Sequence, residues 1–365
     1  MLAPRLLRSP SDGRHLPVLE GVRGLAVGIV LVSHMSTAGV LLYPGLNFKG
    51  RGAWGIYLFF VLSAFLLTWH YLETPERIAN SLRYWRGYAG RRIARIYPLY
   101  TLALLLTAVS PLVSFALAGK EEPSVWRHLL LLDGYKIFWT IPVEMKMYAL
   151  LPFLLTAVYG VARGRTGRSL ATLLAFLLAT AWLWPPDVVT YRSVDLHDFL
   201  APFVVGFMAA FAWRDLSRRE LSVSVRRCCD LAGLLALVAI LAPWLLGDPF
   251  GPSHRLARTV LGNDAAWYGA AWGIVLLCTL AGRGLLQRLF EFRPLRVLGV
   301  VSFSAYIWHM PILEGLRRTS FANRGEPMSF PIIFAAVVLI SIVSFLVVEQ
   351  PAMQAFARWS RRGRT

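Results

Sequence analysis

The chain has 365 residues, of which 56% are hydrophobic and only 16% are charged, and its formal net charge is +18. Soluble domains average about 25% charged residues, so the composition excludes an ordinary soluble protein and indicates an integral membrane protein. The basic residues occur in short blocks between apolar runs and are not interleaved with aromatic residues, so we expect no nucleic-acid partner. The three cysteines form no Cys-x-x-Cys pair, so we expect neither a disulfide framework nor a metal site.

Apolar runs close to the length of a transmembrane helix occur about ten times. They predict an all-α, polytopic bundle with spans at about 19–42, 54–73, 96–118, 137–160, 169–185, 197–213, 229–247, 265–282, 297–315 and 329–349. If the N-terminus is cytoplasmic, most Lys and Arg residues fall in cytoplasmic segments, in agreement with the positive-inside rule. We therefore expect both termini in the cytoplasm and residues 1–365 to form one transmembrane domain, with short tails at 1–16 and 350–365.

The first span carries an arginine and a histidine. Arg23 and His34 are eleven residues apart, which is about three helical turns, so both should leave the same face with a rise of about 16 Å. Ionisable groups within a span are costly and usually face a protein interior or a wet cavity. From the spacing alone, a catalytic role and a plain interhelical hydrogen bond are both open for His34.

Three further polar residues, Ser63, Glu144 and His309, are predicted at a depth similar to that of His34, so the four should form one layer. A carboxylate near a histidine is the usual arrangement for a general base, because it orients the imidazole and stabilises its charged form. Glu144 is thus a candidate partner of His34, and Tyr148, four residues on, shares its helical face. The alternatives are an interhelical hydrogen bond for Glu144 and a packing role for Ser63.

A cluster of arginines marks the start of the third span. Arg92 and Arg95 are three residues apart and share a face, and Arg23 is predicted at the same membrane surface. Paired guanidinium groups suit phosphate, because they form bidentate, charge-assisted hydrogen bonds. The alternative, which we prefer for Arg91, is a topology signal in contact with lipid headgroups. Together with His34, the cluster indicates group transfer from a phosphate-bearing donor to an acceptor hydroxyl.

Six segments carry recognisable motifs in order along nearly the whole chain. They are Glu20–Ala26 followed by His34, Gly52–Phe65, Arg92–Pro98, Trp139–Tyr148, Ser302–His309 and Val348–Pro351. In this order they resemble the acyltransferase-3 family of bacterial integral-membrane O-acyltransferases, in its short form without a fused SGNH domain. Three positions depart from the family pattern and put the local geometry near Glu144 in question: Ala64, Pro142 and Met147.

The resemblance implies an acyl-CoA donor, usually acetyl-CoA, and a carbohydrate or lipid-linked sugar as acceptor, in the bacterial cytoplasmic (inner) membrane. By motif position, it implies His34 as the catalytic histidine, Glu144 as the acidic residue of the site, and a donor-binding set consisting of Arg23, Arg92 and Arg95. Ser63, Tyr148 and His309 are expected to contact substrate or to support the site. Direct transfer with His34 as general base and covalent catalysis through an acyl-histidine both stay open.

A transporter or exporter is the alternative function, because buried His and Glu residues also serve proton relays in transporters. Many transporters contain inverted repeats with interrupted helices. The sequence shows no internal repeat of that kind, which favours the acyltransferase.

Overall fold

The computed structural model describes residues 16–73, 81–118, 124–184, 194–245, 264–317 and 329–362. Within these ranges the chain is helical and has no strand, which confirms the predicted all-α class. The helices are α2 (Pro17–Thr37), α3 (Gly52–Leu72), α5 (Leu82–Val109), α6 (Pro111–Ala118), α7 (Val125–Leu129), α8 (Thr140–Ala162), α9 (Thr166–Leu183), α10 (Leu200–Leu216), α11 (Val223–Leu245), α13 (Asp264–Gly282), α14 (Leu285–Phe290), α15 (Arg293–Val300), α16 (Ser302–Arg317), α17 (Ser329–Ser344) and α18 (Gln350–Arg362). The 3₁₀ turns η1 (Lys136–Trp139) and η2 (Leu196–Phe199) lead into α8 and α10, and the π-helical turn η4 (Phe345–Glu349) joins α17 to α18.

Eight helices within the described ranges are long and apolar enough to cross a membrane, and a ninth span results if α15 and α16, which meet at 81°, count as one. The polytopic bundle is therefore confirmed, and the chain is an integral membrane protein. The predicted run at 229–247 lies largely on α11, which carries Arg226, Arg227 and Asp230 near its start and is not among the eight. The cytoplasmic location of both ends stays a prediction, and residues 1–15 and 363–365 lie outside the described ranges.

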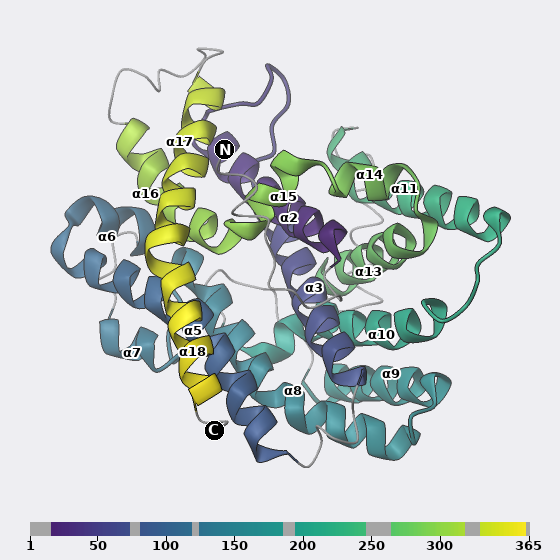
Figure 1. The fold of residues 1–365 in the computed structure, drawn as a ribbon. Coiled ribbons are helices and arrows are strands. Elements are labelled where there is room, and N and C mark those ends of the chain that lie inside the picture. The colour runs from purple at the N-terminus through teal and green to yellow at the C-terminus, as the bar shows by residue number, and fades with distance from the viewer. Residues whose placement is uncertain are drawn as a thin grey trace.

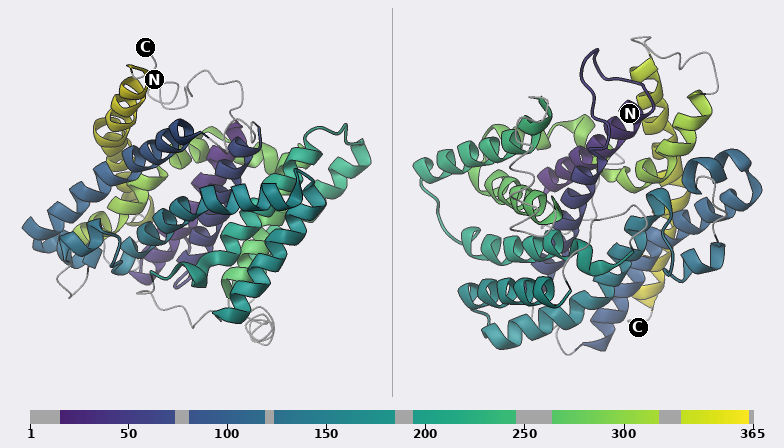
Figure 2. Two further views of the ribbon diagram at one scale, coloured as in Figure 1. Left: turned by 90° about the horizontal axis from the view of Figure 1, so that it is seen from below. Right: turned by 180° about the vertical axis from the view of Figure 1, so that it is seen from behind.

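Helices α2 and α3 cross the middle of the molecule (Figure 1). Helices α9, α10, α11 and α13 lie to one side of this pair, and α5, α16, α17 and α18 lie to the other, as the two further views in Figure 2 also show. Helix α5 begins at Leu82, where the Ser81 side chain accepts a hydrogen bond from the backbone N–H of Tyr84 (3.1 Å). The arginine-rich segment before the third predicted span is thus helical and continuous with that span.

Glycines bring α2 into backbone contact with its neighbours. A Cβ atom on Gly24 would overlap the carbonyl group of Leu295, and one on Gly299 would overlap the carbonyl group of Glu20. Small residues allow this close approach between membrane helices, where dispersion replaces the hydrophobic effect as the force that holds helices together. The Arg296 guanidinium adds an ion pair to the Glu20 carboxylate at 2.9 Å. This packing fixes the rotation of α2 and hence the direction of the side chains on its opposite face.

The residues that depart from the family pattern fit their surroundings. Ala64 is buried and its methyl group faces Gly206, where a Cβ atom would collide with it. Pro142 lies in the first turn of α8, where a proline needs no intrahelical N–H bond and does not break the helix. Met147 is buried in the core. The helix that carries Glu144 is therefore regular at this point.

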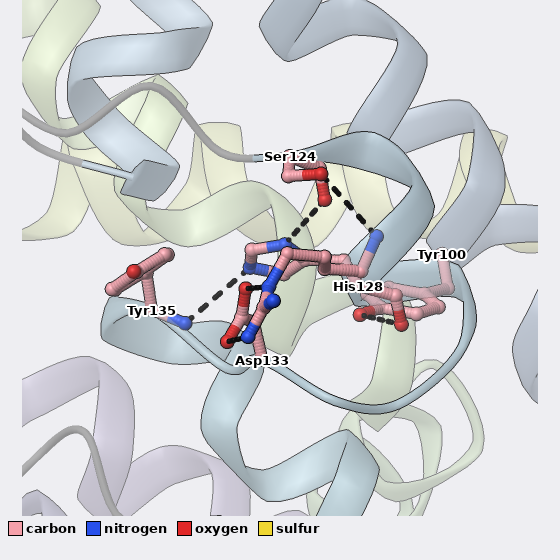
Figure 3. Close-up of polar contacts among 6 residues, drawn as sticks. Tyr100, Ser124, His128, Asp133 and Tyr135 are labelled. Atoms are coloured by element: carbon pink, nitrogen blue, oxygen red, sulfur yellow. Dashed lines mark hydrogen bonds and ion pairs between the residues drawn. The ribbon is translucent and has the colours of Figure 1, made fainter.

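The segment before α8 is held by a buried histidine (Figure 3). The His128 ring accepts a hydrogen bond from the Tyr135 backbone N–H at Nε2 (3.4 Å), so Nδ1 carries the proton and donates to the Ser124 carbonyl oxygen (3.0 Å). Tyr100 on α5 donates to the His128 carbonyl oxygen (3.1 Å). Burial lowers the pKa of His128 and keeps the ring neutral. This arrangement sets the start of η1, where Lys136 adopts a left-handed φ of 46°.

The long rod formed by α17, η4 and α18 runs past α5 (Figure 1). Near its end, the Phe356 ring occupies the space in which a side chain at Gly90 would lie. Residues 350–362, expected as part of a short tail, thus form a helix that packs on α5.

Candidate active site

A pocket lies between α2, α3, α5, α8 and α16. Its lining is part polar and part apolar. The polar and aromatic-hydroxyl lining residues are Arg23, Ser63, Arg92, Arg95, Thr140, Glu144, Tyr148, Ser302 and Tyr306. The apolar lining residues are Ile56, Phe59, Phe60, Leu66, Leu67, Ile96, Ile141 and Phe303. Six of the eight residues predicted as functional from the sequence thus line one pocket, and His34 and His309 are the two that do not.

The three predicted donor-binding arginines share this pocket. Arg23 comes from α2, and Arg92 and Arg95 come from α5. Arg23 interacts electrostatically with both other arginines, so three like charges are held close together around one space. The Arg92 guanidinium lies 5.8 Å from the centre of the Tyr148 ring, and its Nε is buried without a hydrogen-bond partner among the described residues. Such a site favours an anion, because an anion would relieve the repulsion and satisfy the unpaired donors.

Glu144 is the acidic centre of the pocket. The Ser63 hydroxyl donates to Oε1 of Glu144 at 2.9 Å, and the Tyr148 hydroxyl donates to the same oxygen. The predicted sharing of a face by Glu144 and Tyr148 is thus seen as a direct contact. Tyr88 on α5 donates to the Tyr148 carbonyl oxygen (3.1 Å) and ties this part of α8 to the arginine-bearing helix. The carboxylate also interacts electrostatically with Arg23.

His34 lies apart from this acidic centre and beside His309. The centres of the two rings are 5.0 Å apart, with 48° between the ring planes. His34 is in the last turn of α2, which ends at Thr37 rather than near residue 42. Gly52, the first residue of α3, lies next to His34, and a Cβ atom built there would be 3.7 Å from its Nε2. His34 is not among the residues that line the pocket.

The four polar residues predicted to share one layer therefore form two pairs. Ser63 is eleven residues along α3 from Gly52, a rise of about 16 Å, so the Ser63–Glu144 pair and the His34–His309 pair lie at different levels. Counting residues along each predicted span placed all four at one depth, because the apolar run of the first span continues beyond Thr37, where α2 ends. Glu144 is thus held by Ser63 and Tyr148, and the ring in contact with His34 is that of His309.

Tyr306 and Thr140 lie between these two levels. Both belong to motif segments, Ser302–His309 and Trp139–Tyr148, but neither was predicted as a site residue. Tyr306 lines the pocket, and its ring centre is 5.9 Å from that of His309. Its hydroxyl donates to the Ile137 carbonyl oxygen (2.6 Å) and accepts from the Thr140 hydroxyl (3.2 Å). A line of polar groups thus runs from the arginines through Tyr306 to the two histidines.

Glu349, in the closing motif Val348–Pro351, is a further buried polar residue near the pocket arginines. It is 1% exposed, ends the π-helical turn η4, and accepts a hydrogen bond from the Ser304 hydroxyl on α16. It also interacts electrostatically with Arg95. A glutamate at the end of an apolar run was the available signal, since buried carboxylates in spans need a partner.

The chain matches one protein family and several curated proteins. Residues 16–346 match the family described as the acyltransferase domain. YrhL of Bacillus subtilis is 25% identical, over 96% of this chain and 57% of its own length. The O-acetyltransferase OatA of Staphylococcus aureus is 20% identical, over 93% and 57%, and the peptidoglycan O-acetyltransferase OatA of Listeria monocytogenes is 24% identical, over 93% and 56%. The chain thus spans little more than half the length of these curated relatives. No solved structure matches the chain.

Proposed function

This chain belongs to the acyltransferase-3 family, and from that premise we propose that it is a membrane O-acyltransferase acting on a carbohydrate hydroxyl. The donor is acyl-CoA, with acetyl as the simplest acyl group, and the acceptor is a cell-wall or lipid-linked sugar. The names of the two OatA relatives, which are O-acetyltransferases, support this reaction class, and one of them is named for peptidoglycan. The transporter alternative has no support from the family. We place the enzyme in the cytoplasmic membrane, with the donor entering from the cytoplasm.

The observation that carries the proposal is that three arginines and a hydrogen-bonded glutamate line one pocket. The CoA phosphates would bind Arg23, Arg92 and Arg95, because guanidinium groups match phosphate oxygens in charge and geometry. Glu144 would hold the Ser63 and Tyr148 hydroxyls in place and balance the charge of Arg23. It would thereby keep the arginine side of the pocket ordered when no donor is bound.

The reaction would take place at His34. Arg23 and His34 are separated by about 16 Å along α2, so the donor must be elongated to contact both ends at once. Acyl-CoA meets this requirement because a flexible arm separates its phosphates from its thioester, whereas acetyl phosphate is too short. His34 would take the proton of the acceptor hydroxyl, and the oxygen would attack the thioester carbonyl. The C–S bond then breaks, and the protonated His34 returns its proton to the CoA thiolate.

Labelled acyl transfer tests the proposal. The purified protein in liposomes would be supplied with radiolabelled acetyl-CoA and a lipid-linked or peptidoglycan-derived sugar, and label in the acceptor and free CoA thiol would both be measured. We expect wild type to release one thiol per acetyl group transferred and His34→Ala to lose transfer while still binding donor. His70→Ala, which removes an exposed histidine at the end of α3, is the matched control and should keep activity. Full activity in His34→Ala would refute the role of His34, and transfer from acetyl phosphate as fast as from acetyl-CoA would refute the elongated-donor argument.

A further inference from the structure

His309 is buried in α16 and has one satisfied and one unsatisfied ring nitrogen. His309 is only 2% exposed, and its Nδ1 lies 2.7 Å from the carbonyl oxygen of Tyr306. A carbonyl oxygen can only accept, so Nδ1 carries the proton and Nε2 carries the lone pair. This Nε2 is buried and has no hydrogen-bond partner among the residues that the structure describes. Unsatisfied buried acceptors are rare and costly, so a nitrogen fixed in this way needs an explanation.

The His34 ring packs against the His309 ring. The ring centres are 5.0 Å apart, and the rings touch without a hydrogen bond between them. The His34 side chain is half-buried at the end of α2 and makes no hydrogen bond among the described residues, so a rotation of its ring toward His309 breaks none. Lys136 interacts electrostatically with His34 and opposes a positive charge on the imidazole. Glu144 is already bonded to Ser63 and Tyr148.

We infer that His309 is the positioning residue of His34: as a neutral acceptor of fixed tautomer, it receives a hydrogen bond from one nitrogen of His34 and leaves the other nitrogen unprotonated. This inference rests on the proposed function, in which His34 is the base. The Tyr306 carbonyl holds His309, and His309 holds His34, so the chain of contacts has the same logic as a triad in which the third group orients the base.

In this arrangement one proton passes from the acceptor hydroxyl through His34 to the CoA thiolate. Once the His34 ring has turned toward His309, it donates its one N–H to Nε2 of His309, and its free nitrogen faces the acceptor hydroxyl. When that nitrogen takes the hydroxyl proton, the imidazolium keeps its bond to His309 Nε2, which stays neutral throughout. The same proton then leaves with the CoA thiolate, so His309 changes neither its charge nor its tautomer.

Two substitutions of similar size separate positioning from packing. His309→Gln offers a carbonyl oxygen near the former place of Nε2, whereas His309→Phe fills the same space without an acceptor. We expect His309→Phe to lower kcat about 10- to 100-fold, the range found when a group that orients a functional histidine is removed. The KM for acyl-CoA should stay within about twofold of wild type, because the arginines are untouched, and His309→Gln should recover most of the lost kcat. Equal losses in both variants, or full activity in His309→Phe, would overturn the inference.

A measurement that needs no catalytic turnover tests the positioning of His34 separately from the proposed acyl transfer. Nitrogen-15 NMR of histidine-labelled protein in liposomes reports which nitrogen of each imidazole carries the proton, and His34→Ala identifies the His34 signals. We expect one tautomer of His34 in wild type and in His309→Gln, and a mixture of both in His309→Phe. An unchanged His34 signal in His309→Phe would refute positioning by His309 whether or not the protein transfers acyl groups. A single tautomer without any acyl transfer would instead uphold the contact and refute the proposed function.

Discussion

Replacement of Arg92 by alanine tests the donor pocket most directly. Arg92 lines the pocket, its guanidinium lies over the Tyr148 ring, and its buried Nε has no hydrogen-bond partner within the described ranges. A CoA phosphate would supply that partner. The alanine variant would therefore lose a charge-assisted hydrogen bond to the donor, and within the protein it would lose the contact of Arg92 with the Tyr148 ring.

The size of the effect follows from that one interaction. A hydrogen bond to a charged group contributes about 1.5–3 kcal/mol. Since about 1.4 kcal/mol corresponds to a tenfold change in affinity, the Kd for acyl-CoA should rise about 10- to 150-fold. Arg92→Lys should fall between wild type and alanine, because an ammonium group keeps the charge but loses the planar fork.

Thermal unfolding in detergent at increasing acetyl-CoA measures this change. A ligand present at 100 times its Kd stabilises the folded state by about 2.7 kcal/mol. A variant that binds about 30-fold more weakly would keep only about 0.9 kcal/mol of that stabilisation at the same concentration. The ligand-dependent rise in Tm should therefore shrink to about a third of the wild-type rise.

Arg91→Ala is the matched control because it removes the same charge one residue away. Arg91 is exposed and does not line the pocket. We expect its donor-dependent Tm shift to equal that of wild type. Equal weakening in both variants would mean that net charge, rather than the Arg92 contact, governs binding, and it would refute the assignment of Arg92 to the donor pocket.

Three further predictions concern the acidic centre, the helix contacts and pH. Tyr148→Phe removes one donor to Glu144 and should weaken donor binding several-fold and lower Tm, as measured in the same titration; unchanged binding would contradict a role for this bond in the pocket. Gly24→Ala should destabilise the fold by about 1–3 kcal/mol in denaturant unfolding, because the methyl group overlaps backbone, whereas Gly160→Ala, with open space around it, should have a small effect. The folded-state pKa of His128 lies below its usual value of about 6.5, so its neutral form stabilises the fold at neutral pH. This contribution is lost as the pH falls below about 6.5, and Tm should fall with it more in wild type than in His128→Phe.

The sequence predicts the pocket better than it predicts the position of the histidine. Arginines at helical spacing and the four-residue separation of Glu144 and Tyr148 are local patterns, and local patterns survive folding. The end of α2 is different, because apolar residues continue to Leu42 after the helix has stopped. Gly39, with a φ of 85°, lies directly after the helix end and was the signal that hydropathy alone misses.

Contacts between helices distant in sequence were beyond prediction. The pairing of His34 with His309 depends on how α2 and α16 are rotated, and that rotation is set by glycine contacts such as Gly24 with Leu295. A glutamate at the end of an apolar run indicated that Glu349 has a buried partner. Its hydrogen bond with Ser304 depends on a π-helical turn, and no sequence pattern predicted that turn. Side-chain periodicity fixes neighbours on one helix, whereas partners across helices are decided by packing.

The π-helical turn at Phe345–Glu349 also determines how the rod of α17 and α18 responds to a change in length. A π turn closes at i→i+5 and holds one residue more than an α turn, so removal of one residue within it would restore regular α-helix and leave the residues that follow close to their present rotation. Removal of one residue between the π turn and Phe356 would instead rotate everything after it by about 100°. Phe356 would then turn away from Gly90, and α18 would lose its packing on α5, the helix that carries two of the pocket arginines. We therefore expect a deletion in the first turns of α18 to destabilise the protein more than a deletion within the π turn.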